Sequence, residues 1–468
     1  MRVRLRHRIS SQGGQKKIGK DQRLRHLTAP MNHQYSRNPD HIRRRNVPAP
    51  DNAAVDRHLQ DLLSPSVYSQ QAYYRSLGLR ERVLTLPLMV AAVVTLLWQQ
   101  VPSVMELTRM LNRQDLLWSK AVEVSRQAVS ERFLSFPYQL FEGVFEDLVP
   151  RLKTRWRQRQ RPLPPSVSYA MKHFEQLWAA DGSVLEALFR KLDSLQDCPA
   201  GQLAGKLCTV IELGSQLPVE IWFHEDAKAH DCQFLDDLLA LATAKTLLVL
   251  DRGFYDFEWW AKLMAQQVDF ICGAKSNLAY TVVQELSLTP RLKDRLIEIG
   301  HNQQGHPLLR LRLIEVPKGK GWYRYVTSVL DPEVLPPYVV IDLYARRWRI
   351  EDAFHLVKRL LGLAYLWTGS LNGIKLQIWA TWLIYAVLVD LSDAVAEAVQ
   401  LPLERISMEM VWRGLYHFND AYHRGLAHDP VSYLAAPENR DLGVIKAIRK
   451  PPKRLDFSPY FNTLPETS

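Results

Sequence analysis

The segment IDLYARRWRIEDAFHLVKRLL, residues 341–361, has the periodicity of an α-helix whose polar and apolar rows lie side by side. At about 3.6 residues per turn, Tyr344, Arg347, Glu351 and Lys358 fall within roughly 60° of one another around such a helix. The adjacent row is apolar and consists of Ile350, Phe354, Val357 and Leu361. A helix that faced solvent would carry its charges opposite the apolar row. The pattern therefore predicts a helix that presents Glu351 at the edge of a core.

Two acidic residues stand directly after apolar segments that have the composition of buried strands. Asp181 follows QLWAA and precedes Gly182, and Asp251 follows TLLVL and precedes an Arg-Gly pair. Ligands and catalytic groups of open α/β sheets gather at the carboxyl ends of strands. An Asp-Gly pair is more often a simple turn, so neither position is decisive alone. Because the helix of residues 341–361 supplies a third carboxylate, we expect Asp181, Asp251 and Glu351 to meet.

The region around these motifs has the pattern of an α/β fold. Strands are expected at residues 176–181, 206–213, 217–225, 246–251 and 269–275, and helices at 231–243 and 256–267. Between residues 286 and 335 the segments alternate apolar and polar residues, with breaks at Gly305 and at the KGKG of residues 318–321. We therefore expect an α/β core that is interrupted by an antiparallel insertion of β-strands.

The helix and the two Asp motifs together match a known pattern. The spacing Tyr344-x2-Arg347-x3-Glu351-x6-Lys358 resembles the Y-R-E-K signature of the insertion sequence four family of bacterial DDE transposases, and AADGS and LDRGFYD resemble that family's other two acidic motifs. The resemblance covers roughly residues 80–400. It implies a mixed sheet of the ribonuclease H type with flanking helices and a β-strand insertion. It also implies cut-and-paste transposition by a homodimer that nicks DNA at terminal inverted repeats and transfers the strand to target DNA.

Three converging carboxylates repel one another unless cations join them. Oxygen ligands with open positions suit Mg²⁺ or Mn²⁺. Two such ions about 3.5–4 Å apart can activate an attacking hydroxyl and stabilise the leaving oxygen of a phosphodiester. We therefore expect Asp181, Asp251 and Glu351 to be both the catalytic and the metal-binding residues. Arg347 and Lys358, on the same helix face, are expected to hold phosphates beside them.

Further residues are candidate contacts for double-stranded DNA. The run RLKTRWRQRQR, residues 151–161, has six basic residues and no acid, which favours phosphate contact over a solvated helix end. Trp322 and Trp348 are candidates for stacking a flipped base, as the resemblance implies, with core packing as the alternative. His230 and Asp231 are either a helix cap or groups near the metal ions. The expected DNA-binding residues are Tyr344, Arg347, Lys358, Trp322, Trp348, Lys275, Arg155, Arg157 and Arg159.

Charge is distributed unevenly over the 468 residues. The first 50 residues carry 13 of the 60 Lys and Arg but only two of the 49 acids, so this tail alone accounts for the net charge of +11. Its composition predicts disorder, as a solvated extension or a nonspecific nucleic-acid arm. The apolar run of residues 83–98 is shorter than the roughly 20 residues that span a bilayer. We expect a buried helix there, no membrane association, and a location in the bacterial cytoplasm, at the nucleoid when bound to DNA.

The predicted organisation has seven parts. They are a disordered basic tail (1–55), a helical DNA-binding domain (56–150), a basic linker (151–168), the first part of the ribonuclease H-like core (169–285), the β-strand insertion (286–340), the catalytic helix and end of the core (341–400), and a C-terminal helical region that could serve dimerisation (401–468). Two alternatives stay open, a catalytically silent DNA-end-binding protein and a stand-alone metal-dependent nuclease. The intact set of three carboxylates favours cleavage over the first, and the helical arm favours a transposase over the second.

Overall fold

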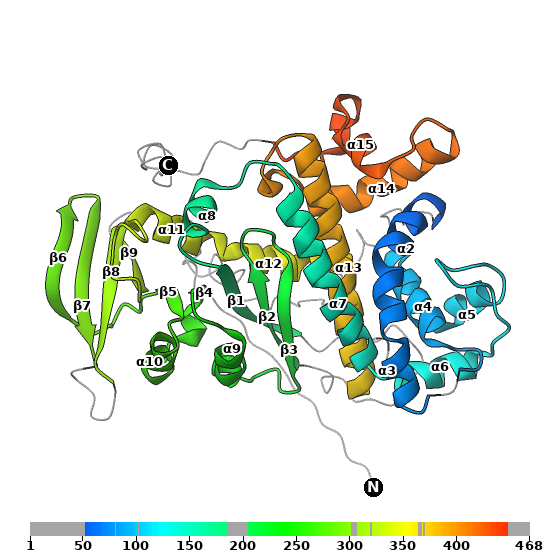
Figure 1. Ribbon diagram of the computed structural model, residues 1–468, viewed down its shortest axis with the longest axis horizontal. Coiled ribbons are helices and arrows are strands. Elements are labelled where there is room, and N and C mark those ends of the chain that lie inside the picture. The colour runs from blue at the N-terminus through cyan, green and yellow to red at the C-terminus, as the bar shows by residue number, and fades with distance from the viewer. Residues whose placement is uncertain are drawn as a thin grey trace, which may run out of the picture. The chain divides into compact units, whose positions relative to one another are not determined.

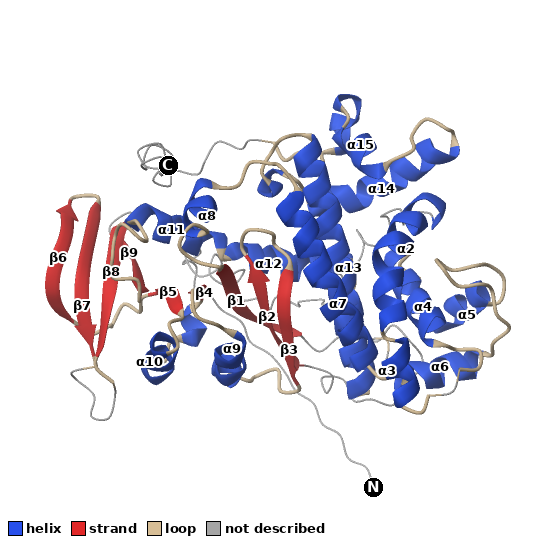
Figure 2. Cartoon of the chain, viewed as in Figure 1, coloured by secondary structure: helices blue, strands red, loops and turns tan. Residues whose placement is uncertain are grey.

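The computed structural model describes residues 52–79, 81–101, 103–185, 205–300, 307–318, 321–363, 367 and 370–447. All of them belong to one compact unit, residues 48–468. The predicted tail up to residue 51 and the basic stretch 448–454 lie outside the described residues. Figure 1 gives the order of the elements along the chain, and Figure 2 separates helices from strands.

A single mixed sheet of nine strands forms the α/β part of the described chain, in the order β3-β2-β1-β4-β5-β9-β8-β7-β6. The central β1, β4 and β5 are parallel, and the other neighbours are antiparallel. The strands are β1 (Gln176–Leu185), β2 (Gly205–Glu212), β3 (Pro218–His224), β4 (Thr246–Leu250), β5 (Asp269–Gly273), β6 (Thr281–Thr289), β7 (Leu292–Ile299), β8 (Leu309–Lys318) and β9 (Gly321–Thr327). This mixed α/β arrangement is consistent with a ribonuclease H-like core.

The expected β insertion is present, and it extends the core sheet instead of forming a separate unit. β6 to β9 form an antiparallel meander, and Tyr325 of β9 pairs with Gly273 of β5. The meander begins at Thr281, a few residues before the predicted start at residue 286. The pairing satisfies backbone groups that β5 would otherwise leave exposed at an edge. The insertion is therefore held in fixed register beside the strands that carry the acidic motifs.

The two faces of the central strands bury different side chains, because alternate residues of a strand point to opposite faces. Leu177 and Ala179 of β1 join a core with α7, α11, α12 and α13, whereas Trp178 and Ala180 join a second core with α9 and α10. These helices are α7 (Gln139–Gln158), α9 (Leu235–Leu241), α10 (Phe257–Ala265), α11 (Pro337–Arg346), α12 (Trp348–His355) and α13 (Leu371–Ala398). By this alternation, position 181 faces α11 and α12, and position 182 faces the side of α9.

Two of the amino-terminal helices begin directly after a capping serine. Ser103 accepts a hydrogen bond from the Glu106 N–H at 3.1 Å, and Ser125 accepts one from the Ala128 N–H at 3.2 Å. The helices of this part are α2 (Asn52–Ser69), α3 (Gln71–Ser76), α4 (Leu86–Trp98), α5 (Val104–Leu111) and α6 (Arg126–Ser135). They share one hydrophobic core with α13, α14 (Met408–His423) and α15 (Pro430–Ala435). The predicted helical region therefore lies in the same compact unit as the sheet.

α13 lies between the amino-terminal helices and the sheet (Figure 1). It has 28 residues, and among the described residues it is the one helix that is long and apolar enough to cross a membrane. In the structure, 94% of its most apolar window is buried inside the protein. The apolar helix expected near residues 83–98 is α4, and it is buried as predicted. Both helices are core elements of this fold.

Helical structure occupies most of residues 151–168, which were predicted to form a basic linker. α7 continues to Gln158, and α8 spans Pro165–Ala170. Only residues 159–164 form an extended connection. The basic residues of the run are thus held on a rigid helix and at its carboxyl end, and not on a flexible chain.

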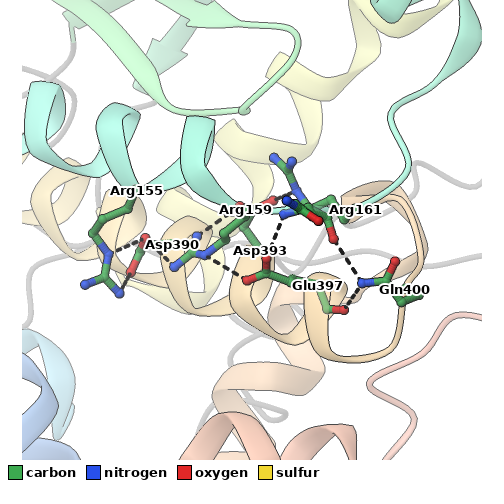
Figure 3. A network of polar contacts seen from close by, with 8 residues as sticks. Arg155, Arg159, Arg161, Asp390, Asp393, Glu397 and Gln400 are labelled. Atoms are coloured by element: carbon green, nitrogen blue, oxygen red, sulfur yellow. Dashed lines mark hydrogen bonds and ion pairs between the residues drawn. The ribbon is translucent and has the colours of Figure 1, made fainter.

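Three of those basic residues form a network of ion pairs with α13 (Figure 3). Arg159 donates to Asp390 at 2.8 Å and to Asp393 at 2.9 Å. Arg155 pairs with Asp390 at 3.0 Å, and Arg161 pairs with Asp393. Both aspartates are buried, and a buried carboxylate without a cation would be strongly destabilising. The network therefore compensates the charge of α13, and it engages Arg155 and Arg159, which were predicted to contact DNA.

Candidate active site

Asp181 and Asp251 lie at the same edge of the sheet. β1 and β4 are parallel with Ala180 opposite Leu250, and an aspartate follows each member of this pair. Glu351 lies on α12, which contacts β1 and β2. Parallel register thus aligns the first two carboxylates, and the helix over the same face brings the third.

The side chain of Arg347 lies among the three carboxylates. Its guanidinium contacts Asp181, and its terminal nitrogens stand 3.6 Å from Asp251 Oδ1 and 3.9 Å from Glu351 Oε1. The side chains of Arg347 and Asp181 are only 6% and 8% exposed, whereas those of Asp251 and Glu351 are 40% and 37% exposed. Asp181 and Arg347 therefore form the buried floor of the site, and the other two acids face solvent.

Burial dominates the electrostatics of this floor. It raises the pKa of Asp181 to about 7; the Arg347 cation lowers that pKa, and the negative charges of Glu351 and Asp251 raise it further. Burial alone would lower the pKa of Arg347, but the neighbouring carboxylates, Asp181 first, raise it overall. In this structure the guanidinium of Arg347 therefore pairs with carboxylates, although Arg347 was predicted to hold a phosphate. A buried acid with a strongly perturbed pKa beside a specific charge is typical of a functional site.

Lys358 is tied to the end of β1, next to Asp181. Its Nζ donates to Ser183 Oγ at 2.6 Å and to the Val184 carbonyl at 2.6 Å. The residue lies in a π-helical turn, Leu356–Leu360, so the helix predicted over residues 341–361 is not uniform. Such turns inside α-helices are frequent at functional sites. Ser183 is the last residue of the AADGS motif, and the sequence did not indicate that it would accept a hydrogen bond from Lys358.

Tyr344 packs on the other side of Arg347. Its hydroxyl lies so close to the backbone of Gly273 that a Cβ there would stand 2.5 Å from it. Its ring contacts Tyr325 of the insertion, with ring centres 5.0 Å apart. Burial is the main cause that raises the pKa of Tyr344 to about 12, so its phenol stays protonated at neutral pH. Tyr344, on α11, therefore contacts both β5 and the insertion next to the acidic residues.

The other predicted DNA contacts differ in their surroundings. Trp348 is 60% exposed beside the site, and the Arg347 guanidinium lies 5.7 Å from its ring centre. Trp322 is partly buried, with Lys293 Nζ 4.1 Å from its ring centre, and it stands on β9 beyond the residues that pair with β5. Lys275 is exposed after β5, with its Nζ 4.5 Å from the Tyr255 ring centre.

The arginines on α7 and at its carboxyl end, which were predicted to contact DNA, differ from one another in their partners. Arg155 and Arg159 pair with α13, as described above, whereas Arg157 is exposed on α7. The structure thus brings Tyr344, Arg347, Lys358 and Trp348 to the acidic site. Arg155, Arg157 and Arg159 lie elsewhere, on α7 and at its carboxyl end.

The donor set of the site has the chemistry that a divalent cation requires. In the described part of the chain, no three His, Cys, Asp or Glu side chains stand close enough together to hold one metal ion. The three acids are instead spaced around the Arg347 guanidinium, which is a cation of the protein itself. They offer only oxygen atoms, and Asp251 and Glu351 are open to solvent, which fits Mg²⁺ or Mn²⁺ in donor type.

Comparison with known proteins places the central part of the chain in context. Residues 191–387 match the family model of the transposase DDE domain. The matched range of this DDE domain contains Asp251 and Glu351 and begins after Asp181. A transposase DDE domain implies a nuclease or transposase activity in general, a DNA substrate and divalent metal ions.

Two curated relatives agree with this domain. A candidate transposase, y4zB, of Sinorhizobium fredii is 23% identical over 220 residues, which cover 43% of this chain and 60% of that protein. The probable transposase of insertion sequence element IS5377 of Geobacillus stearothermophilus is 24% identical over 173 residues, which cover 36% of this chain and 45% of that protein. The chain thus spans less than two thirds of each relative. Together, the domain and the relatives support a transposase.

Proposed function

We propose that this chain is a cut-and-paste transposase of the insertion sequence four family. It cleaves DNA strands at the terminal inverted repeats of an insertion sequence and joins them to target DNA. The observation that supports this most directly is that Asp181, Asp251 and Glu351 surround the buried guanidinium of Arg347. They do so at the carboxyl ends of two parallel strands. Carboxylates at that edge, with no Ser or Cys nucleophile required, suit metal-dependent attack on a phosphodiester.

Asp181, Asp251 and Glu351 would hold the divalent cations, two Mg²⁺ or Mn²⁺ ions. When bound, these would supply Lewis-acid activation of the attacking oxygen and of the leaving oxygen. The positive charge of Arg347 lowers the pKa of Asp181 and so partly opposes the effect of burial. Lys358 fixes the end of β1 and puts an ammonium group beside the site. The exposed ring of Trp348 is available to stack on a base.

The proposed substrate is double-stranded DNA, engaged by a homodimer in the cytoplasm. Tyr344, Trp322, Lys275 and Arg157 are further proposed contacts. Arg155 and Arg159 are proposed as DNA contacts of lower rank. Each would have to leave a buried carboxylate to reach a phosphate.

The test uses a supercoiled plasmid that carries both flanks of the coding sequence. Purified full-length protein with Mg²⁺ is expected to nick this plasmid, and Asp181→Asn, Asp251→Asn and Glu351→Gln are each expected to abolish nicking while the plasmid is still bound. The matched control is Asp352→Asn, which removes an exposed acid next to Glu351 that pairs with Arg349.

The outcomes separate the alternatives. Binding without any nicking by the unmodified protein would indicate a DNA-end-binding protein. Equal nicking of a plasmid without the flanks would indicate a stand-alone nuclease. Nicking that survives any one of the three substitutions would refute the assignment of the acidic residues.

A further inference from the structure

A fourth carboxylate, that of Asp231, lies against the backbone of both aspartate motifs. Asp231 opens a short 3-10 turn, Asp231–Phe234, ahead of α9. A Cβ built on Gly182 would stand 1.9 Å from Asp231 Oδ1, and one built on Gly253 would stand 2.3 Å from Asp231 Oδ2. Each oxygen of one carboxylate thus occupies the space where one of the two motif glycines lacks a side chain. No larger residue fits at either position while Asp231 stays in place.

The alternation of β1 shows from which side this contact comes. Asp181 points toward α12, where Arg347 meets it. Gly182 pairs with Cys208 of β2, and Cys208 belongs to the core on the opposite face, beneath α9. Asp231 therefore supports the strand end from the face opposite to Glu351.

Lys206 holds this carboxylate in place. Its Nζ lies 2.7 Å from Asp231 Oδ1 and donates to the Ala229 carbonyl at 2.8 Å. The side chains are 12% exposed for Lys206 and 19% for Asp231, so the pair is largely withdrawn from solvent. Lys206 lies two residues before Cys208 on β2, and thus on the same face. A partly buried ion pair with a fixed position is a rigid support, since removal of one partner leaves the other charge unpaired.

We infer that Asp231 and Lys206 form a positioning pair that fixes the backbone carrying Asp181 and Asp251. The inference rests on the proposed function for its consequence, namely the spacing of the acids that hold metal. Asp231 contacts the two glycines from the face opposite to that on which Arg347 meets Asp181, so it acts through the backbone and not as a further ligand. A residue that sets the position of metal ligands typically changes metal affinity about 10- to 100-fold.

Hydrogen exchange tests the support without reference to activity. In the full-length protein with a chelator present, Asp231→Ala is expected to speed exchange about tenfold or more in peptides covering residues 178–184 and 250–256. The matched control is Asp236→Ala, which removes an exposed acid five residues further on. Unchanged exchange in the Asp231→Ala protein would overturn the inference. If that variant does not fold, Asp231→Asn, which keeps the size of the side chain, is measured in its place against the same criterion.

Cleavage then tests the consequence. Asp231→Ala is expected to raise the Mg²⁺ concentration for half-maximal plasmid nicking about tenfold, and Asp236→Ala is expected to leave it unchanged. Gly182→Ala should abolish nicking through the clash with Asp231, and the double variant Gly182→Ala/Asp231→Ala should recover part of it, because the added methyl then has space. A double variant that recovers no nicking, or equal Mg²⁺ requirements for the two Asp variants, would refute the pair's role. If the unmodified protein nicks no plasmid while exchange responds as expected, the proposed function fails and the support stands.

Discussion

Asp181→Asn should make the metal-free protein more stable at pH 8, although it removes a residue proposed to be essential. The pKa of Asp181 is raised from 3.8 to about 7 in the folded chain, mainly by burial. Below about pH 4 the group is protonated in both the folded and the unfolded chain, so it adds no pH dependence. Between about pH 4 and 7 the unfolded chain releases a proton that the folded chain retains, so stability falls as the pH rises. Above about pH 7 the group is ionised in both the folded and the unfolded chain, so the loss of stability stays constant.

The size of this cost follows from the same values. A difference of about three pH units, at about 1.4 kcal/mol for each, amounts to about 4 kcal/mol. The attraction of Arg347 is already contained in it, because that cation is one of the causes of the pKa. An amide at position 181 resembles the protonated acid and avoids the cost. We therefore expect Asp181→Asn to gain up to about 4 kcal/mol over the unmodified protein at pH 8 and almost nothing at pH 4.

The assay is urea denaturation with a chelator present, at pH values from 4 to 8. Asp251→Asn is the matched control, because its side chain is 40% exposed and water already solvates its charge. A difference between Asp181→Asn and the unmodified protein that does not change with pH would refute this reasoning. A lower stability of Asp181→Asn at pH 8 would refute it as well.

Further predictions concern metal, charge and the tail. Mg²⁺ should raise the melting temperature of the unmodified protein but not that of Asp181→Asn, since a cation that binds only the folded site stabilises it in proportion to RT ln(1 + [Mg²⁺]/Kd); an equal rise in both would place the metal elsewhere. Lys358→Ala should lower the slope of log affinity for plasmid DNA against log salt by about one phosphate contact, and an unchanged slope would count against that contact. Asp393→Ala should cost about 3–5 kcal/mol of stability in denaturation, because it leaves Arg161 without its buried partner and removes one of the two buried partners of Arg159, whereas Arg157→Ala on the exposed side of α7 should cost almost none. Deletion of residues 1–50 should lower affinity for nonspecific DNA while Mg²⁺-dependent nicking persists, and loss of nicking would show that the tail is required.

The elements that the sequence predicted well are those with local signals. Asp181 and Asp251 follow apolar runs that have to be buried strands, and parallel pairing brings the ends of such strands to one edge. The capping serines at 103 and 125 fix helix starts within three residues of themselves. The alternating segments between residues 286 and 335 were predicted as antiparallel strands, and they pair in that way. In each case the determinant lies within a few residues of the structure that it specifies.

The features that were missed depend on partners far away in the chain. The basic run of α7 carried no hint that Asp390 and Asp393 would face it, because they lie more than 230 positions later and inside an apolar helix. A separation of 166 positions likewise hides the partner of Arg347, since the register between α12 and β1 decides whether it meets a phosphate or Asp181. Asp231 could be read as a helix cap until its contact with Gly182 and Gly253 was known. The sequence shows that a glycine stands at positions 182 and 253, but it does not show which side chain fills the space beside each of them.

The central place of α13 limits how this protein can be divided or recombined. Its sides are covered by α4, α6 and α7 from the amino-terminal part, by α14 and α15 from the carboxyl-terminal part, and by β3 of the sheet. A fragment that started at residue 169 would leave a helix of membrane-like hydrophobicity in contact with water, together with Asp390 and Asp393 stripped of their arginines. Such a fragment would aggregate, so the smallest useful expression unit includes the amino-terminal helices from α2 onward. For the same reason, an exchange of amino-terminal helices with those of a relative would succeed only if the matching α13 were exchanged with them.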